Sequence, residues 1–230
     1  FEFVGSRKES YSKESRNPNV KEGGFKDDIY RRDFTINSLS ISLNKKKFGL
    51  LIDLFDGRKD LHNKLIKTCL EPKITFKDDP LRMLRAIRFA SQLSFDIESE
   101  TFQGIIENKE RIKILSYSRI SDELNKIIMS EKPSYGFKLL LTSGLLKIIF
   151  PEMDNLKGIE KINNHIHKDN FFHTLKVLDN VSKVSNSLWL RWAAILHDIA
   201  KPLTKRYNEK VGWTFHGHED LGSRMVPKIF

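Results

Sequence analysis

The sequence has little cysteine, proline or glycine, and each shortage excludes a class of protein. The single cysteine, Cys69, cannot form an internal disulfide, so we expect a reducing, cytoplasmic setting. With only 12 Gly and 7 Pro, and without repeats or low-complexity segments, the composition does not fit a collagen-like or disordered chain. Apolar runs of about 20 residues, the length of a membrane span, do not occur, so we expect no membrane partner.

Positive charge is what the sequence has in excess. Forty Lys and Arg against thirty Asp and Glu give a formal charge of +10 and a pI near 9.5, which favours a polyanionic partner such as nucleic acid or nucleotides. The length of 230 residues is enough for one or two domains with a real core. The chain opens without an initiator Met on Phe1–Val4, a strand-like segment, and we expect it to be a fragment with further sequence at both ends.

Strand patterns come first along the chain and helical patterns follow, which is typical of an α+β fold. Ser6–Asp28 is polar, with few large apolar residues, and predicts a long mobile loop. Ser38–Leu43 alternates polar and apolar residues, Asn44–Lys47 is a basic turn, and Phe48–Leu54 follows as a second strand, so this segment predicts a hairpin. From Leu70 to Phe150 the pattern is helical almost throughout.

Residues 78–89 predict an amphipathic helix with an unusual polar face. Three arginines share one face and five apolar residues share the other, at about 100° per residue: Arg82, Arg85 and Arg88 against Met83, Leu84, Ala86, Ile87 and Ala90. Pro80 suits the first helical position, and Asp79 before it suits a cap. Alone, this face predicts either a solvated basic surface or an anion-binding site.

Two further patterns carry chemistry. Arg119 and Glu123 are four residues apart in a predicted helix and are expected to form an ion pair on one face. After Pro151 the sequence predicts two helices, Phe171–Val184 and Ser187–Ala200, ended by Pro202. They bear His173 and the adjacent pair His197 and Asp198, and His216–Glu219 follows. Imidazole and carboxylate ligands suit a divalent metal, with a bound water as nucleophile, if these residues converge.

Four stretches, taken in this order, resemble successive motifs of one family: Arg31–Asn37, Asp53–Leu61, Asp78–Phe89 and Arg119–Lys126. The family is that of the class II CCA-adding tRNA nucleotidyltransferases and bacterial poly(A) polymerases. The histidine and aspartate set resembles the HD domain fused to many bacterial members. The resemblance implies a small mixed β-sheet nucleotidyltransferase head, incomplete here, then an all-α neck and body, and a helical HD domain.

Through this resemblance, Asp79 and Arg82 are expected to recognise the base of the incoming CTP or ATP. Cytosine and adenine both present an amino donor beside a ring-nitrogen acceptor, which a carboxylate and a guanidinium complement. Uracil and guanine present a carbonyl and a ring N–H in those places, so they are mismatched. By analogy with groove readout, a good bidentate contact discriminates by about 1–3 kcal/mol, and unpaired buried polar groups add to the rejection.

The other expected nucleotide contacts also follow from the resemblance. Three residues match the motif that holds the sugar and the triphosphate: Arg32, Asp33 and Asn37. Arg85 and Arg88 are expected to face the triphosphate, and a structural pairing with Asp78 is the alternative for one of them. Asp53–Asp60 matches a motif that links head to neck, for which we expect a structural role. Ser6–Asp28 matches a flexible loop that in the family helps the site change from C to A addition.

The resemblance also implies metals. The family's Asp-x-Asp pair, which holds two Mg²⁺ ions for phosphoryl transfer, is expected before Phe1, so we expect no catalytic residue in this chain and an inactive fragment. At the HD site His173, His197 and Asp198 are the expected ligands of a divalent metal, and a last Asp is expected beyond Phe230.

We expect three parts: a head over 1–68, a helical neck over 69–155 and the start of the HD domain over 156–230. The leading functional hypothesis is a tRNA nucleotidyltransferase that adds C and A from CTP and ATP. The motifs also allow a poly(A) polymerase or an A- or CC-adding relative. The other hypotheses are a metal-dependent HD phosphohydrolase and a catalytically silent tRNA-binding module.

Overall fold

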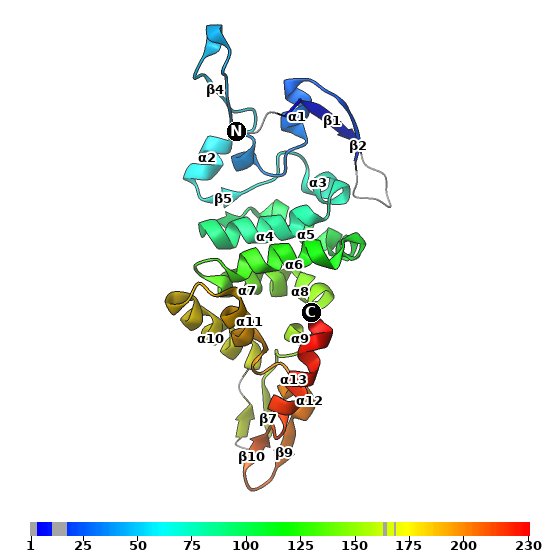
Figure 1. The fold of residues 1–230 in the computed structure, drawn as a ribbon, viewed down its shortest axis with the longest axis vertical. Coiled ribbons are helices and arrows are strands. Elements are labelled where there is room, and N and C mark those ends of the chain that lie inside the picture. The colour runs from blue at the N-terminus through cyan, green and yellow to red at the C-terminus, as the bar shows by residue number, and fades with distance from the viewer. Residues whose placement is uncertain (1–3, 11–17, 163–164, 168) are drawn as a thin grey trace. The chain divides into compact units, whose positions relative to one another are not determined.

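A computed structural model describes residues 4–10, 18–162, 165–167 and 169–230 (Figure 1). The chain divides into two compact units, Phe1–Leu124 and Asn125–Phe230, and the boundary between them falls inside helix α6 (Tyr117–Ile128). Of the strand predicted at the start, Phe1 to Phe3 lie outside the described residues. No helix in the described ranges is long and apolar enough to cross a membrane.

The first strands of unit 1 form an antiparallel hairpin within the segment that the sequence predicts as a loop. Arg7 faces Glu22 across this hairpin, and Glu9 faces Val20. Charged or polar residues occupy all of the paired positions except that of Val20, so the alternation of apolar residues that signals a strand is missing. The loop prediction is therefore wrong for the described residues, while 11–17 lie outside them. The elements are β1 (Arg7–Ser10), β2 (Asn19–Glu22) and α1 (Phe25–Tyr30).

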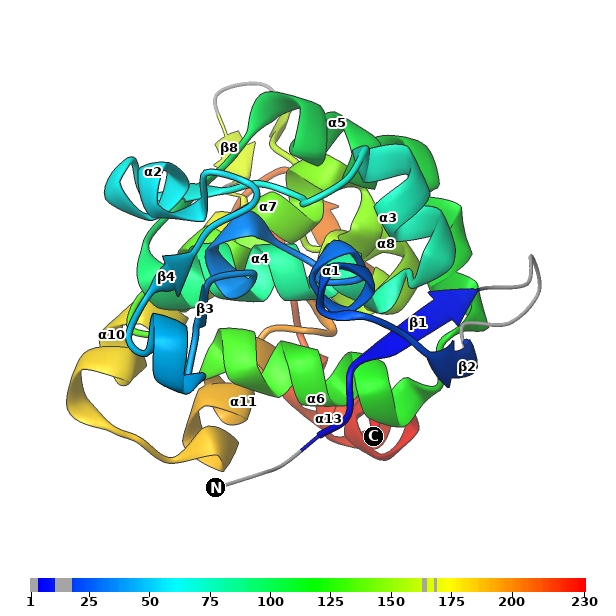
Figure 2. The same cartoon turned by 90° about the horizontal axis from the view of Figure 1, so that it is seen from above.

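The second predicted hairpin is confirmed, although its strands are short. Ser40 pairs with Ile52 and Ile41 with Leu51 in antiparallel register. Figures 1 and 2 show the two hairpins of unit 1 on opposite sides of α1. The elements of this segment are η1 (Thr35–Asn37), β3 (Ser40–Ile41), η2 (Lys45–Lys47), β4 (Leu51–Ile52), α2 (Gly57–His62) and β5 (Leu65–Ile66).

A network of backbone contacts fixes the turn after β4. Asp53 accepts hydrogen bonds from the backbone N–H groups of Phe55, Gly57 and Arg58 at 3.3, 2.8 and 3.0 Å. At Gly57 a Cβ atom would lie 2.2 Å from the carbonyl oxygen of Thr35, so no larger residue fits this approach of α2 to η1. The contacts support the structural role expected for this segment.

Helix α4 (Leu81–Leu93) carries the core of unit 1. The five residues of its predicted apolar face are all 0% exposed: Met83, Leu84, Ala86, Ile87 and Ala90. Pro80 lies one residue before the helix, and Asp79 caps it by accepting from the N–H of Leu81 at 3.1 Å. Strand β6 (Asp96–Ile97) pairs in parallel with β5. The other elements are α3 (Pro72–Asp78), α5 (Ser99–Asn108) and η3 (Lys109–Ile114).

Unit 2 is helical, with short hairpins. The two predicted helices are confirmed as α10 and α11, but α11 ends at Leu196 instead of Ala200, and Pro202 lies in the first turn of a new short helix. Arg191, 2% exposed, donates to the carbonyls of Ile128 and Ser130, both at 2.8 Å, and so joins α11 to the end of α6. The elements are α7 (Pro133–Ser143), α8 (Leu145–Ile149), α9 (Pro151–Asp154), β7 (Glu160–Ile162), β8 (His165–His167), α10 (Asn170–Val184), α11 (Leu188–Leu196), α12 (Lys201–Thr204), β9 (Arg206–Asn208), β10 (Gly212–Thr214) and α13 (His218–Ile229).

Candidate functional site

A cavity of about 790 Å³ opens in unit 1, and charged side chains line it. They come from the β1 hairpin, the end of α1 and the loop after it, the start of α4, and α6. Such an excess of positive charge in a concave site favours a polyanionic ligand. The charged lining residues are Arg7, Glu9, Arg31, Arg32, Asp33, Asp79, Arg82, Arg85 and Arg119.

Asp33 lies at the centre of a set of contacts in this cavity. One of its carboxylate oxygens accepts from Nε and Nη2 of Arg85 at 2.7 and 2.6 Å. The other accepts from the amide of Asn37 at 3.0 Å and from the backbone N–H of Phe34 at 2.9 Å. A carboxylate has about four acceptor positions, so these contacts use its capacity. Asp33 thereby fixes the direction of both Arg85 and Asn37.

Arg82 and Asp79, the expected base-recognition pair, line the same cavity at the start of α4. Arg82 is 9% exposed, and its guanidinium donates to the backbone carbonyl of Arg31 at 2.6 Å. The carboxylate of Asp79 caps α4 through the N–H of Leu81. A donor fork and a carboxylate are therefore held at one end of one helix. This is the arrangement expected from the sequence.

Arg88 differs from its two neighbours on the arginine face. It is 8% exposed and lies 3.2 Å from Glu123, itself 3% exposed, with its guanidinium carbon 4.1 Å from the ring centre of Phe89. It is not among the residues that line the cavity. The partners of Arg85 and Arg88 are Asp33 and Glu123 rather than Asp78. Because Arg82 and Arg88 are buried, the interpretation of this face as a solvated basic surface is wrong.

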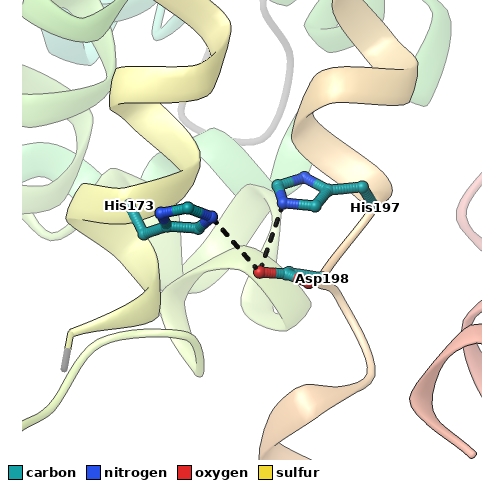
Figure 3. Close-up of side chains that lie close together, drawn as sticks. All are labelled: His173, His197 and Asp198. Carbon is teal, nitrogen blue, oxygen red and sulfur yellow. Dashed lines mark ion pairs between the residues drawn. The ribbon is translucent and has the colours of Figure 1, made fainter. Parts of the chain in front are cut away.

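A second cluster lies in unit 2, where two histidines point toward one aspartate (Figure 3). Nε2 of His197 and Nε2 of His173 lie 3.2 and 3.7 Å from one carboxylate oxygen of Asp198, which is 3% exposed. Nε2 of His218 lies 3.6 Å from the other oxygen. Helix α10 provides the first histidine, the turn after α11 provides the adjacent pair, and α13 begins at His218. The three expected HD residues are thus brought together.

The electrostatics of this cluster are dominated by Asp198. Burial alone would raise the pKa of Asp198, but hydrogen bonds from His197 and Lys201 outweigh it and hold this pKa below its ordinary value. The hydrogen bond with Asp198 raises the pKa of His197, against the opposing effect of burial. Lys201 lies 2.7 Å from the carboxylate. The carboxylate therefore stays ionised at neutral pH.

The donor set fits a divalent cation. The candidate ligand atoms of His173, His197 and Asp198 all lie within 4.8 Å of one another. Nδ1 of His197 lies 2.9 Å from the carbonyl of Ala194, and Nδ1 of His218 lies 2.8 Å from that of Phe215. When Nδ1 donates to a carbonyl, Nε2 is left to bind a metal. A hydrogen bond of this kind, from the ring nitrogen that does not bind the metal, is usual for a metal-binding histidine.

Comparison with known families decides where the chain belongs. Three family descriptions match it in succession. The poly A polymerase head domain matches residues 1–67, the probable RNA and SrmB-binding site of polymerase A matches 94–157, and the HD domain matches 170–230. The chain belongs to the poly(A) polymerase and CCA-adding enzyme family.

Individual members of the poly(A) polymerase and CCA-adding enzyme family agree with this placement. The A-adding tRNA nucleotidyltransferase of Deinococcus radiodurans is 31% identical, over 88% of this chain and 47% of its own length. A Bacillus stearothermophilus CCA-adding enzyme solved in complex with CTP is 32% identical with a TM-score of 0.52, over 55% of this chain and 31% of that one. A Thermotoga maritima CCA-adding enzyme complexed with tRNA is 25% identical with a TM-score of 0.60, over 89% of this chain and 48% of that one. The chain spans about half the length of the curated relatives it matches.

Within the head-domain match of this family, the structure adds residues that sequence reasoning missed. Arg31 contacts Asp28 at 2.6 Å and Glu9 at 3.4 Å, and Asp28 also contacts Arg32 at 3.1 Å. Arg31 belongs to the matched motif, but its side chain was assigned no role. Asp28 precedes Arg31 and Arg32 by three and four residues, so helical spacing was the available signal.

Proposed function

We propose that the whole protein adds C and A nucleotides from CTP and ATP to the 3′ end of tRNA. The observation that carries the proposal is the arginine-lined cavity, which Asp79 and Arg82 both line at the start of α4. Membership of the family supports it, as do the tRNA substrate in the name of the relative from Deinococcus and the CTP and tRNA in the titles of the two structural relatives.

Base selection is assigned to Asp79 and Arg82. The carboxylate accepts a hydrogen bond from the amino group of cytosine or adenine, and the guanidinium donates to the adjacent ring nitrogen. Arg82 has five N–H donors, of which one is engaged by the carbonyl of Arg31. That contact restrains the guanidinium before a base arrives. A uracil or guanine would place a carbonyl against the carboxylate and a ring N–H against the guanidinium.

Binding of the triphosphate and sugar is assigned to Arg32, Arg85 and Asn37. Arg32 is 44% exposed at its side chain and lines the cavity, so it is accessible to phosphate oxygens. Arg85 is 33% exposed and held by Asp33. Since Asp33 already accepts four hydrogen bonds, contact with a ribose hydroxyl requires that one of them be exchanged. Arg88 pairs with Glu123 and so joins α4 to α6.

Two Mg²⁺ ions, when bound, would supply the activation of the tRNA hydroxyl and offset the phosphate charge. The carboxylates that line the cavity are engaged by arginines or backbone N–H groups, Glu9 and Asp33 by arginines and Asp79 by Leu81. An Asp-x-Asp pair does not occur in the sequence. The residues of this chain therefore bind and orient the nucleotide, and we assign the metal ligands to sequence outside it.

The direct test is extension of a tRNA that lacks its terminal CCA, and of one that ends in CC, by the whole protein. With CTP and ATP together, the proposal predicts products longer by three and by one nucleotide. Addition of A to the second substrate alone would reassign the protein as A-adding, two-nucleotide products would make it CC-adding, and long A tails would make it a poly(A) polymerase. No extension of either tRNA would contradict the proposal.

A second activity is favoured by the cluster around Asp198. Two imidazoles and an ionised carboxylate would hold a divalent metal whose bound water attacks phosphomonoesters or cyclic phosphates. The double variant His197→Ala and Asp198→Ala is expected to lose both bound metal and phosphatase activity. If metal content and phosphatase activity both survive in this variant, the second activity should be discarded.

A further inference from the structure

We propose that Asp28 is a positioning residue for nucleotide binding, holding Arg32 directly and Arg82 through Arg31. The inference rests on the proposed function, and it assigns a task to a carboxylate that does not line the cavity. Asp28 is near the end of α1, and its side chain is 15% exposed.

The two oxygens of Asp28 serve different arginines. Oδ1 accepts from Nε and Nη2 of Arg31 at 2.9 and 2.6 Å, and Oδ2 accepts from Nη2 of Arg32 at 3.1 Å. Charge-assisted hydrogen bonds of this kind are stronger than neutral ones and restrict the direction of the guanidinium. Arg31 and Arg32 are adjacent cations in a cavity with four further arginines, Arg7, Arg82, Arg85 and Arg119. A carboxylate shared between the two offsets their repulsion.

The contact reaches Arg82 through the backbone of Arg31. The carbonyl that accepts from Arg82 at 2.6 Å belongs to the residue whose side chain Asp28 holds. Glu9 of the hairpin lies on the opposite side of that guanidinium, at 3.4 Å. Arg31 is thus held from two sides, and its carbonyl offers Arg82 a fixed acceptor. Loss of Asp28 would loosen the triphosphate contact and the base contact together.

The charge state of Asp28 suits this task. Burial alone would raise the pKa of Asp28, but hydrogen bonds from Arg31 and Arg32 outweigh it, and the pKa lies below its ordinary value. The carboxylate is therefore ionised at neutral pH, so all three hydrogen bonds are charge-assisted.

The neighbouring Asp27 offers a matched control. It lies on the same helix and carries the same charge, but its carboxylate accepts from the backbone N–H of Gly24 at 2.9 Å instead of from an arginine. An asparagine at 27 can still accept that bond. Asp28→Asn and Asp27→Asn therefore remove the same charge one residue apart, and only the first changes the contacts of Arg31 and Arg32.

The test measures KM and kcat for CTP and ATP in tRNA extension, with UTP as the mismatched nucleotide, for both variants of the whole protein. Asp28→Asn is expected to raise KM about 10-fold for CTP and ATP and to reduce discrimination against UTP, while kcat stays within about 3-fold. Asp27→Asn is expected to match the wild type. Equal KM values for the two variants, or a fall in kcat with unchanged KM, would overturn the inference.

Two further measurements keep the inference falsifiable. The first is the equilibrium affinity of the wild type and of both variants for CTP. It can be measured even if the wild type extends no tRNA, so it separates failure of the inference from failure of the proposed function. If Asp28→Asn unfolds, Asp28→Glu keeps the charge and is expected to bind CTP more tightly than a folded Arg31→Gln variant. In the double variant Asp28→Asn with Arg32→Gln, the losses in CTP affinity are expected to be less than additive, and full additivity would contradict the direct contact.

Discussion

Single carboxylates organise unit 1 by accepting several hydrogen bonds each. Asp33 takes four, from Arg85, Asn37 and the backbone of Phe34, and Asp53 takes three from backbone N–H groups. Replacing such a carboxylate leaves several donors without their acceptor, which makes the replacement costly. These residues therefore set local geometry, whether or not they touch a ligand.

Asp53 gives a prediction at this scale with a defined pH dependence. Burial opposes ionisation, but the N–H groups of Arg58, Gly57 and Phe55 hold the pKa of Asp53 below its ordinary value. This carboxylate therefore stabilises the fold at pH values above the ordinary aspartate pKa of about 3.9. The stabilisation is lost as the pH falls through the lower pKa of Asp53 in the folded protein. Asp53→Asn is expected to lower the free energy of unfolding at pH 7 by about 1–2 kcal/mol, and the difference from the wild type should shrink toward pH 3 in chemical denaturation.

The control for this change is Asp56→Asn. Asp56 lies in the same turn, is exposed, and makes no side-chain capping bond to α2. Asparagine also tolerates its left-handed backbone, with φ of 58°. A pH-independent loss in Asp53→Asn, or an equal loss in the control, would show that the carboxylate of Asp53 does not hold the turn.

The residues of the cavity could be predicted from the sequence where they belong to a recognisable motif. Asp79 and Arg82 are such residues, and the structure places both on the cavity wall. The burial of Arg88 could not be predicted, because its partner Glu123 is 35 positions away in sequence. Asp28 could not be singled out, because its spacing to Arg31 and Arg32 is that of an ordinary exposed helix pair. The assignment of nucleotide contacts to all of these residues stays a prediction.

At the scale of elements, the apolar pattern predicted α4, α10 and α11, since burial of one face gives a helix its period. The same reasoning missed the β1–β2 hairpin. Its strands pair Arg7 with Glu22 and Lys8 with Lys21, and none of those four residues provides a hydrophobic signal. The ion pair of Glu9 with Arg31 joins that hairpin to α1, a contact that only the folded chain reveals.

The buried pair of Arg88 and Glu123 joins α4 to α6 and gives a prediction at this scale. Glu123→Gln leaves the guanidinium of Arg88 buried without its countercharge, so the free energy of unfolding is expected to fall by about 3–5 kcal/mol. The double variant Arg88→Met with Glu123→Leu is expected to recover much of this loss. Denaturant unfolding of the whole protein measures both.

The control is Glu110→Gln, which breaks an exposed ion pair with Lys113. Because water screens this pair, its loss is expected to leave the denaturation midpoint unchanged. If Glu123→Gln behaves like this control, the pair does not hold the two helices together.

At the scale of the whole molecule, the two candidate sites draw their residues from different compact units. The residues assigned to the nucleotide lie between Arg32 and Arg85 in unit 1, and the candidate metal ligands lie between His173 and Asp198 in unit 2. We therefore expect the two activities to separate. The variant His197→Ala with Asp198→Ala should lose metal and phosphatase activity but keep tRNA extension, while Arg85→Ala should do the reverse. A joint loss in either folded variant would contradict this independence.

The central claim is that Asp79 and Arg82 select the nucleotide, and one ratio tests it directly. The ratio of kcat/KM for CTP or ATP to that for UTP or GTP is measured on one preparation, so it does not depend on the folded fraction. Arg82→Ala is expected to reduce this ratio roughly 5- to 150-fold, which corresponds to about 1–3 kcal/mol. Arg85→Ala should instead lower kcat/KM equally for all four nucleotides. An unchanged ratio in Arg82→Ala would contradict the account.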